Sequence, residues 1–277
     1  MRIKFKTLLI FAAVIFIVFP MAGCKKIDEA KLKMGLKNND FEYIKQDKAD
    51  KIIIQSTRDK GFRFIVTDKR TIKEMYDILS TAKKVQEKSA LEPDYIFEIY
   101  EGSAVHRFNY ITGMDKNDYG NLYSEDSVYI VSKRIDYDII RNLWNYRAPK
   151  DFKKVYYGSI IEFLKKYGAE ITKNSTNVGI DLSQDVDTAK YMLSTELEDF
   201  KSDLAKTMSG AKLVDKDKEK NDVVVAIKTQ GYKTTVFKAI ITVNDKKDNS
   251  EVKYYVNDVY DNSEWTIEVT KDKPDKF

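Results

Sequence analysis

The sequence predicts an α+β fold of two small units, each an antiparallel sheet packed with helices, behind an N-terminal leader and a polar tether. Several short segments alternate apolar and polar residues, which is the period of strands with one buried face. Other segments repeat apolar residues at intervals of three and four, as helices with one buried face do. Strands and helices do not alternate along the chain, so a Rossmann-type or periplasmic-binding-protein fold is not expected.

The first unit is predicted over residues 50–150, with the element order β-β-α-β-β-β-α. Its first helix should begin at Thr71, because Thr71 and Glu74 have the spacing of a capping box. Its second helix has an apolar face that includes Trp144, and it ends before Pro149. The predicted strands of this unit contain residues 52–54, 62–66, 95–99, 106–110 and 128–131.

The second unit is predicted over residues 154–271. A short helix, Ser159–Tyr167, should end at Gly168, since glycine is common just past a helix C-terminus. A longer helix, Asp187–Met208, has an apolar stripe and an opposite face with four acidic residues, Glu196, Glu198, Asp199 and Asp203. After a short strand at 178–182, three short turns joining four strands predict a meander over residues 223–228, 234–243, 252–260 and 265–269.

The beginning of the chain has the order of a secretory signal. Basic residues come first, at Arg2, Lys4 and Lys6, and Leu8–Phe19 is an unbroken apolar stretch. That stretch is shorter than the roughly 20 residues that cross a bilayer as a helix. We therefore expect a cleaved signal peptide, with an uncleaved membrane anchor and a soluble secreted form as the alternatives.

Small residues precede Cys24, which is the only cysteine of the chain. This segment resembles the bacterial lipoprotein signal, in which small residues precede an invariant cysteine, although Met21 stands where leucine is usual. The resemblance implies cleavage before Cys24, a diacylglycerol on its sulfur, and a lipid anchor at the outer face of the cytoplasmic membrane. Residues 1–23 are then the signal peptide, and the polar residues 24–49 are the tether.

Charge and composition exclude several classes of protein. The chain has 48 Lys and Arg against 44 Asp and Glu. Loss of the leader leaves 45 basic residues against 44 acidic ones, so the mature chain is almost neutral. Nucleic acid is not expected as a partner, because phosphate binding needs a concentrated positive face. One cysteine and one histidine leave no disulfide framework, multi-cysteine metal site or two-histidine zinc site. We expect neither a metal nor a cofactor.

The sequence contains no familiar catalytic motif: G-x-S-x-G, the P-loop, G-x-G-x-x-G and H-E-x-x-H are all missing. His106, the only histidine, lies in a predicted strand and is interpreted as a structural residue. Glu98 lies in another strand and should face outward with Tyr100. We predict no catalytic residue. The alternative is a carboxylate-dependent hydrolase of cell-wall material, to be tested at Glu98 and His106.

Five segments of the first unit carry a second resemblance. They are the Phe62-Arg63-Phe64 strand, the helix at 71–84, Tyr95–Glu98, Tyr129–Val131 and the helix containing Trp144. Residues 50–150 resemble, through these segments, the small α+β domain of uncharacterised Gram-positive lipoproteins, the YhfM-like group. That group carries no agreed activity, so the resemblance implies location and fold only.

We predict a non-catalytic binding or accessory role in the cell envelope, with a protein or a peptidoglycan fragment as the partner. Tyrosine is abundant, with 18 residues, and it suits recognition surfaces because it joins a large contact area to a polar tip. The predicted contact surface lies on the final meander, at Tyr232, Tyr254, Tyr255 and Trp265. A small-ligand-binding lipoprotein with a deep apolar pocket is a further alternative.

Overall fold

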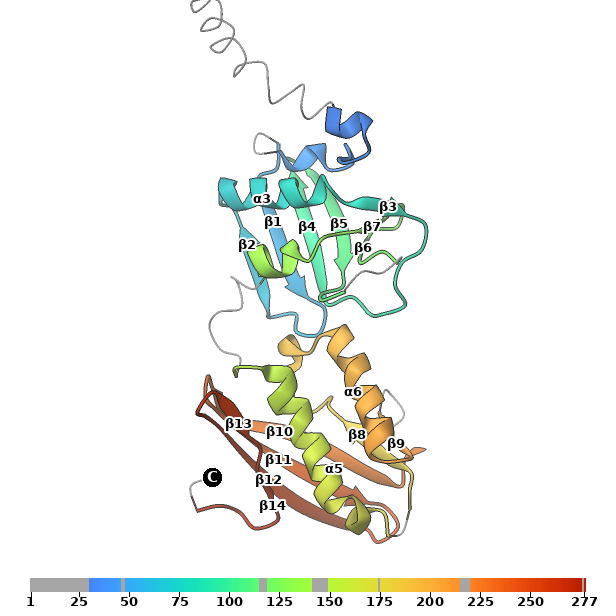
Figure 1. The fold of residues 1–277 in the computed structure, drawn as a ribbon, viewed down its shortest axis with the longest axis vertical. Helices are drawn as coiled ribbons and strands as arrows, with labels where there is room; N and C mark the ends of the chain where they lie inside the picture. The colour runs from blue at the N-terminus through green and yellow to red at the C-terminus, as the bar shows by residue number, and fades with distance from the viewer. Residues whose placement is uncertain are drawn as a thin grey trace, which may run out of the picture.

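The computed structural model describes residues 30–45, 48–114, 119–140, 149–173, 175–214, 220–275 and 277. Two α+β domains follow one another along the longest axis of the molecule (Figure 1), which confirms the predicted fold class. The described part of the first domain ends at residue 140, and that of the second begins at Pro149. The leader, Cys24 and the helix predicted around Trp144 lie outside the described residues.

The first domain is a seven-stranded antiparallel sheet with the strand order β2-β1-β4-β5-β6-β7-β3. Its strands are β1 Lys51–Ser56, β2 Arg63–Val66, β3 Lys83–Val85, β4 Tyr95–Glu101, β5 Ala104–Tyr110, β6 Leu122–Tyr123 and β7 Val128–Ile130. The five strands predicted by alternation are all present. The sequence pattern missed β3 and β6, because segments of two or three residues are too short to show a period.

Helix α3, Lys69–Leu79, and the π-helical segment η2, Ile135–Ile140, cover one face of this sheet (Figure 1). The helix begins earlier than predicted, because the N-cap is Asp68 and not Thr71. The Asp68 carboxylate accepts hydrogen bonds from the Thr71 amide at 2.9 Å and from the Thr71 hydroxyl at 2.8 Å. An aspartate is as good an N-cap as threonine, and here it precedes the whole apolar stripe.

The predicted tether, 24–49, is too long. The short 3-10 helix η1, Glu42–Ile44, packs on the first domain, and Phe41 and Ile44 are buried in its core. The Asn38 side-chain amide also donates hydrogen bonds to the carbonyls of Leu79 and Ala82 at the end of α3. Phe41 and Ile44 lie in a strongly polar stretch of the sequence. They are buried because they cover an edge of the first domain's core, which the local sequence pattern does not reveal.

The second domain has the sheet order β13-β12-β11-β10-β8-β9, with β14 paired to β12. Its helical segments are η3 Lys153–Tyr157, α5 Gly158–Ile171, η4 Ala189–Tyr191 and α6 Ser194–Thr207. Its strands are β8 Val178–Asp181, β9 Ala211–Leu213, β10 Val223–Lys233, β11 Val236–Asp245, β12 Ser250–Asp261, β13 Glu264–Thr266 and β14 Val269–Thr270. The predicted meander is confirmed, but β8 runs parallel to both β9 and β10. The segment β8-α6-β9 is therefore one βαβ unit, which the sequence pattern did not predict.

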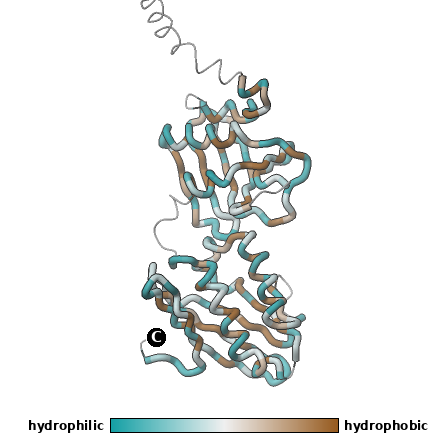
Figure 2. The backbone as a smooth tube through the Cα atoms, viewed as in Figure 1, coloured by the Kyte–Doolittle hydropathy of each residue, from teal (hydrophilic) through white to brown (hydrophobic). Residues whose placement is uncertain are grey.

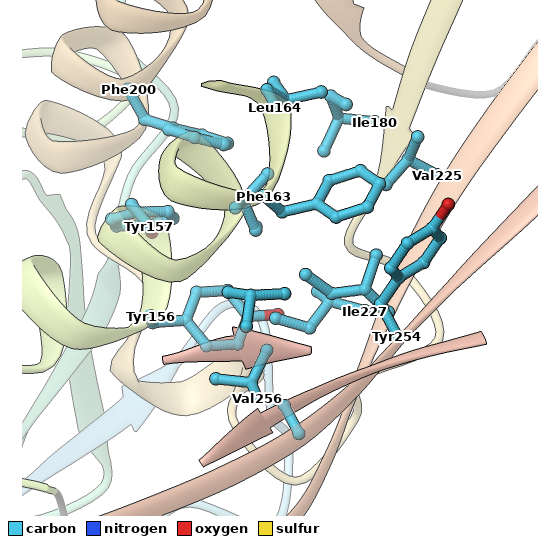
Figure 3. Close-up of a cluster of buried hydrophobic side chains, with 14 of the residues drawn as sticks. Tyr156, Tyr157, Phe163, Leu164, Ile180, Phe200, Val225, Ile227, Tyr254 and Val256 are labelled. Atoms are coloured by element: carbon cyan, nitrogen blue, oxygen red, sulfur yellow. The ribbon is translucent and has the colours of Figure 1, made fainter. Parts of the chain in front are cut away.

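Helices α5 and α6 lie on the same face of the second sheet and enclose its core (Figures 1 and 2). Figure 3 shows Phe163 of α5 reaching the Tyr254 ring of β12, and the two ring centroids are 4.9 Å apart. Gly168 does not end α5 as predicted, because the helix continues to Ile171. A Cβ atom at Gly168 would lie 2.4 Å from the Met208 methyl group, so this glycine permits the close approach of the chain after α6.

Asp94 joins the two domains. It is buried, and one carboxylate oxygen accepts hydrogen bonds from the Arg58 guanidinium at 2.7 Å and from the Ser194 amide at 2.8 Å. The other oxygen accepts from the Thr112 amide at 2.8 Å. Arg58, Asp94 and Thr112 belong to the first domain, whereas Ser194 is the first residue of α6. Asp94 thus caps a helix of the second domain, where its negative charge also favours the helix N-terminus.

Further contacts hold the same joint. The Ser194 hydroxyl donates to the Glu92 carbonyl at 2.6 Å, and the Thr195 hydroxyl donates to the Thr112 carbonyl at 3.3 Å. Leu193, which precedes α6, packs against the core of the first domain. The start of α6 is therefore part of both domains, and its position is set from both sides.

We expect Asp94→Ala to lower the free energy of unfolding by about 3 kcal/mol, because the change leaves Arg58 without its ion pair and two backbone amides without an acceptor. Urea unfolding followed by circular dichroism measures this. Asp77→Ala is the control: it breaks the exposed Lys73–Asp77 pair on α3 and should change stability by less than about 0.5 kcal/mol. Equal effects of the two changes would contradict the role of Asp94.

Asp258 of β12 is a fully buried carboxyl group below α5. The Ser159 hydroxyl lies 2.7 Å from Asp258 Oδ2 and 2.5 Å from the Val155 carbonyl, and the Glu268 amide donates to Asp258 Oδ1 at 3.0 Å. A hydroxyl has one proton, so it can donate to only one of its two neighbours. A protonated Asp258 resolves this, since it donates to Ser159 while Ser159 donates to Val155. In agreement, burial raises the pKa of Asp258 to about 7.

This raised pKa makes stability depend on pH. The folded state holds the Asp258 proton more tightly than the unfolded state, so the stabilisation is complete below pH 4 and is lost as pH rises towards 7. Asp258→Asn keeps the shape and the donor without titrating. We expect its stability relative to wild type to increase by about 2 kcal/mol between pH 5 and pH 7, measured by urea unfolding. The exposed control Asp187→Asn should follow wild type, and a parallel shift in both variants would refute the assignment.

Candidate functional site

A cleft of about 790 Å³ opens in the second domain, between the η3–α5 segment and α6. It lies beside the domain joint, since Glu196 in its wall is two residues from Ser194. The cleft is lined by Pro149, Asp151, Phe152, Lys153, Lys154, Tyr157, Gly158, Ile161, Tyr191, Glu196, Phe200 and Asp203. It is open to solvent on one side and apolar over most of its surface, which is typical of sites that hold a partner's side chains.

Aromatic rings form the apolar wall of the cleft. Tyr157 stacks on Phe200 with ring centroids 4.7 Å apart, as Figure 3 shows for these two side chains. The ring centroid of Phe152 lies 6.0 Å from that of Tyr157 and 5.6 Å from that of Tyr191. Phe152 precedes η3 and Tyr157 ends it, and π-helical segments of this kind occur often at functional sites. The rings fix one another, so the wall is formed before any ligand binds.

Glu196 places a half-buried carboxyl group at this apolar wall. No residue that the structure describes forms an ion pair or a side-chain hydrogen bond with it. Burial raises the pKa of Glu196 to about 7; the charges of Asp94 and Asp199 act in the same direction, and that of Lys153 acts against them. A carboxyl group held out of water without a cationic partner is a strong candidate for contact with a ligand.

The Tyr157 hydroxyl is a second unusual polar group at the cleft. Its ring is buried, and the hydroxyl oxygen has no hydrogen-bond partner among the described residues. Burial raises the pKa of Tyr157, so the phenol stays neutral. Leaving a buried hydroxyl unpaired costs about 1–3 kcal/mol.

The structure does not bring together the four residues of the contact surface predicted on the meander. Tyr254 and Trp265 are buried in the second core, where Tyr254 packs against Phe163 and Tyr167. Tyr255 is the next residue of the same strand and therefore faces the opposite side of the sheet, where its ring meets Phe277. Tyr232 is half-buried, and its hydroxyl lies 3.1 Å from that of Tyr191. The four residues share no surface.

The two residues of the hydrolase alternative lie on opposite faces of the first sheet. Glu98 pairs with Arg107 across β4 and β5, whereas His106 pairs with Ile99 on the buried face. The His106 ring stacks on Tyr43 at 3.7 Å, and its Nε2 atom lies 3.3 Å from Glu101. Glu98 accepts a hydrogen bond from the hydroxyl of Tyr100, its expected neighbour on the outer face.

The sequence pattern did not point to the cleft. Glu196 and Asp203 were grouped with Glu198 and Asp199 as the polar face of one helix, which is ordinary for a solvated helix. Only the packing of η3 beside α6 separates Glu196 from its exposed neighbours. A usable signal was the run Phe152–Tyr157, which places three aromatic residues within six positions.

Within the described parts of the chain, no three side chains of the metal-binding types gather at one point, and no helix has the length and apolar character to cross a membrane.

Residues 45–149 match the family described as YhfM protein, which confirms the resemblance predicted for residues 50–150. The match covers the first domain and stops at the residue where the second domain begins. No curated protein and no solved structure matches this chain. The cleft therefore lies almost wholly in the domain that the family match does not cover.

We expect Tyr157→Phe to leave the free energy of unfolding unchanged or to raise it by about 1 kcal/mol, because it removes a buried hydroxyl that has no partner. Tyr110→Phe is the matched control. The Tyr110 hydroxyl donates to Asp136 at 2.6 Å, so its removal should cost about 1–3 kcal/mol. Thermal and urea unfolding of the two variants test this, and a destabilisation of similar size in both would contradict it.

Proposed function

We propose that this protein is anchored by a lipid on Cys24 at the outer face of the cytoplasmic membrane, and that its cleft binds another component of the cell envelope without catalysis. The order of residues in the leader and the sole cysteine at its end support the anchor. Two acyl chains on one cysteine give stable membrane attachment, where one chain is marginal.

The observation that carries the binding role is the preformed cleft. Its aromatic wall is fixed by ring contacts, and its half-buried Glu196 lacks an ionic partner among the described residues. Such a wall loses little conformational entropy when a ligand packs on it, which favours binding. The tyrosines that support recognition are thus in part those of the cleft, Tyr157 and Tyr191, and not those of the meander.

The arrangement of the domains suits an anchored binding protein. The described chain enters the first domain at the end farthest from the second domain (Figure 1). About 14 residues separate Cys24 from Asn38, where contacts with the first domain begin. Even fully extended, a segment of that length spans at most about 50 Å. The first domain then stands next to the membrane and carries the cleft away from the lipid.

In-cell photo-crosslinking tests this proposal. A photoreactive benzoylphenylalanine replaces Ile161 in the cleft of the full-length protein, expressed at native level, and the products are identified by mass spectrometry. We expect one dominant envelope product from Ile161. The matched control replaces Lys253 on the uncovered face of β12, outside the cleft, and should yield little of that product. A product that forms equally from both positions, or only from Lys253, would show that the cleft is not the binding site.

Cys24→Ala separates the anchor from the cleft. The wild type should incorporate a clickable fatty acid and stay with the membrane, whereas Cys24→Ala should do neither and should lose the Ile161 product. Unchanged labelling and membrane retention would refute the lipid anchor. A product of discrete protein mass identifies a protein partner, and a product retained by the wall until muramidase treatment identifies a glycan partner.

A further inference from the structure

We propose that the cleft recognises a basic side chain, of which lysine fits best, on a peptide segment of the partner. The Glu196 carboxylate faces the cationic group of that side chain, and the aromatic wall packs against its apolar stem. This inference rests on the proposed binding role and specifies the chemistry that the same cleft accepts. It commits to a peptide because the cleft is an open channel between two helical segments, which admits a side chain that projects from an extended chain.

The first reason is that Glu196 is an acidic group of the cleft wall that forms no ion pair with a described residue. It is half-buried, and its carboxylate has no ionic partner among the described residues. The lysines nearby are bound to other acids, in the pairs Lys153–Asp199, Lys154–Glu264 and Lys206–Asp203. The Lys153 ammonium lies 2.5 Å from Asp199 and forms its ion pair there, although its charge still acts on Glu196.

The second reason is the surplus of negative charge. The lining of the cleft, the ionic partners of that lining and Lys190 beside the Tyr191 ring contribute five acidic groups, at positions 151, 196, 199, 203 and 264, against four lysines. An apolar wall lowers the local dielectric constant, so this surplus acts on a ligand more strongly than it would in water. A cation is favoured and an anion is repelled.

The third reason is the shape of a lysine side chain. It has a long apolar stem and a compact charge, so it can lie along Phe152, Tyr157 and Phe200 while its ammonium reaches Glu196. Aromatic faces also attract cations directly. The protein makes such a contact beside the cleft, where the Lys190 ammonium lies 5.3 Å from the centre of the Tyr191 ring, which lines the cleft.

Binding of a basic side chain at Glu196 should also depend on pH. An unoccupied cleft leaves Glu196 with a pKa of about 7, and a bound ammonium lowers this pKa by stabilising the carboxylate. The charged groups that face Glu196 are Asp199 on its own helix, Lys153 on η3 and Asp94 across the domain joint. Because the ionised form binds the cation, affinity for a basic peptide should rise between pH 6 and pH 8.

The test uses the full-length protein in detergent micelles and isothermal titration calorimetry. The probes are two acetylated and amidated pentapeptides, alanyl-leucyl-X-leucyl-alanine, with lysine or norleucine at X. Norleucine keeps the stem and removes the ammonium. We expect the lysine peptide to bind at least tenfold more tightly at pH 8, since a charge-assisted contact in an apolar setting exceeds the energy of a tenfold difference. This preference should shrink at pH 6.

Glu196→Gln and Glu198→Gln are the matched variants. Glu198 lies on the same helix, is exposed and pairs with Lys201, so its change should leave both affinities as in wild type. Glu196→Gln should reduce binding of the lysine peptide about tenfold, leave the norleucine peptide unchanged and abolish the pH dependence. Thermal unfolding confirms that both variants are folded.

The outcomes separate the two proposals. Equal binding of both peptides, or lysine preference retained in Glu196→Gln, overturns the recognition of a basic side chain while the cleft remains a binding site. Binding of neither peptide also overturns it, and crosslinking from Ile161 then decides the proposed function on its own.

Discussion

The structure depends on one buried carboxylate, Asp94. It accepts hydrogen bonds from Arg58 and Thr112 in its own domain and from Ser194 at the start of α6. A buried charge is tolerated only when its partners are complete, and here the second domain supplies one of them. The two domains are therefore not structurally independent of one another. Each satisfies polar groups that the other leaves exposed at the joint.

Helix α6 connects this joint to the cleft. Its first residue is bound by Asp94, its first two turns carry Glu196 and Phe200 into the cleft wall, and its later residues cover the parallel strands β8 and β9. A shift of the helix at the joint would move the cleft wall with it, since a helix is stiff over 14 residues. The first domain thereby sets the geometry of a site to which it contributes little surface. The unpaired Tyr157 hydroxyl and Glu196 carboxyl reduce stability where the cleft needs polar groups.

Much of the fold followed from local patterns, and the errors have identifiable causes. Five of the seven strands of the first domain and the meander of the second were predictable, because alternation or an apolar run marks a segment with a buried face. The helix stop at Gly168 was wrong because a glycine can also serve close packing, here against Met208. The four residues of the predicted meander contact surface lie apart, because Tyr254 and Tyr255 are adjacent in one strand and face opposite sides. A count of tyrosines does not distinguish the core from the surface.

The sequence by itself determined the α+β class, the two-domain division, the YhfM-like character of the first domain and the expectation of a lipid anchor at Cys24. These properties depend on period, composition and order along the chain, which are local. Only the tertiary structure decided the burial of Phe41 in the predicted tether, the βαβ unit, the Asp94 joint and the cleft. Each of these brings together residues that are tens of positions apart, and their contact results from tertiary packing within a domain or, for Asp94, between the two domains. No local pattern records which of several acidic residues on a helix will meet an aromatic wall instead of water.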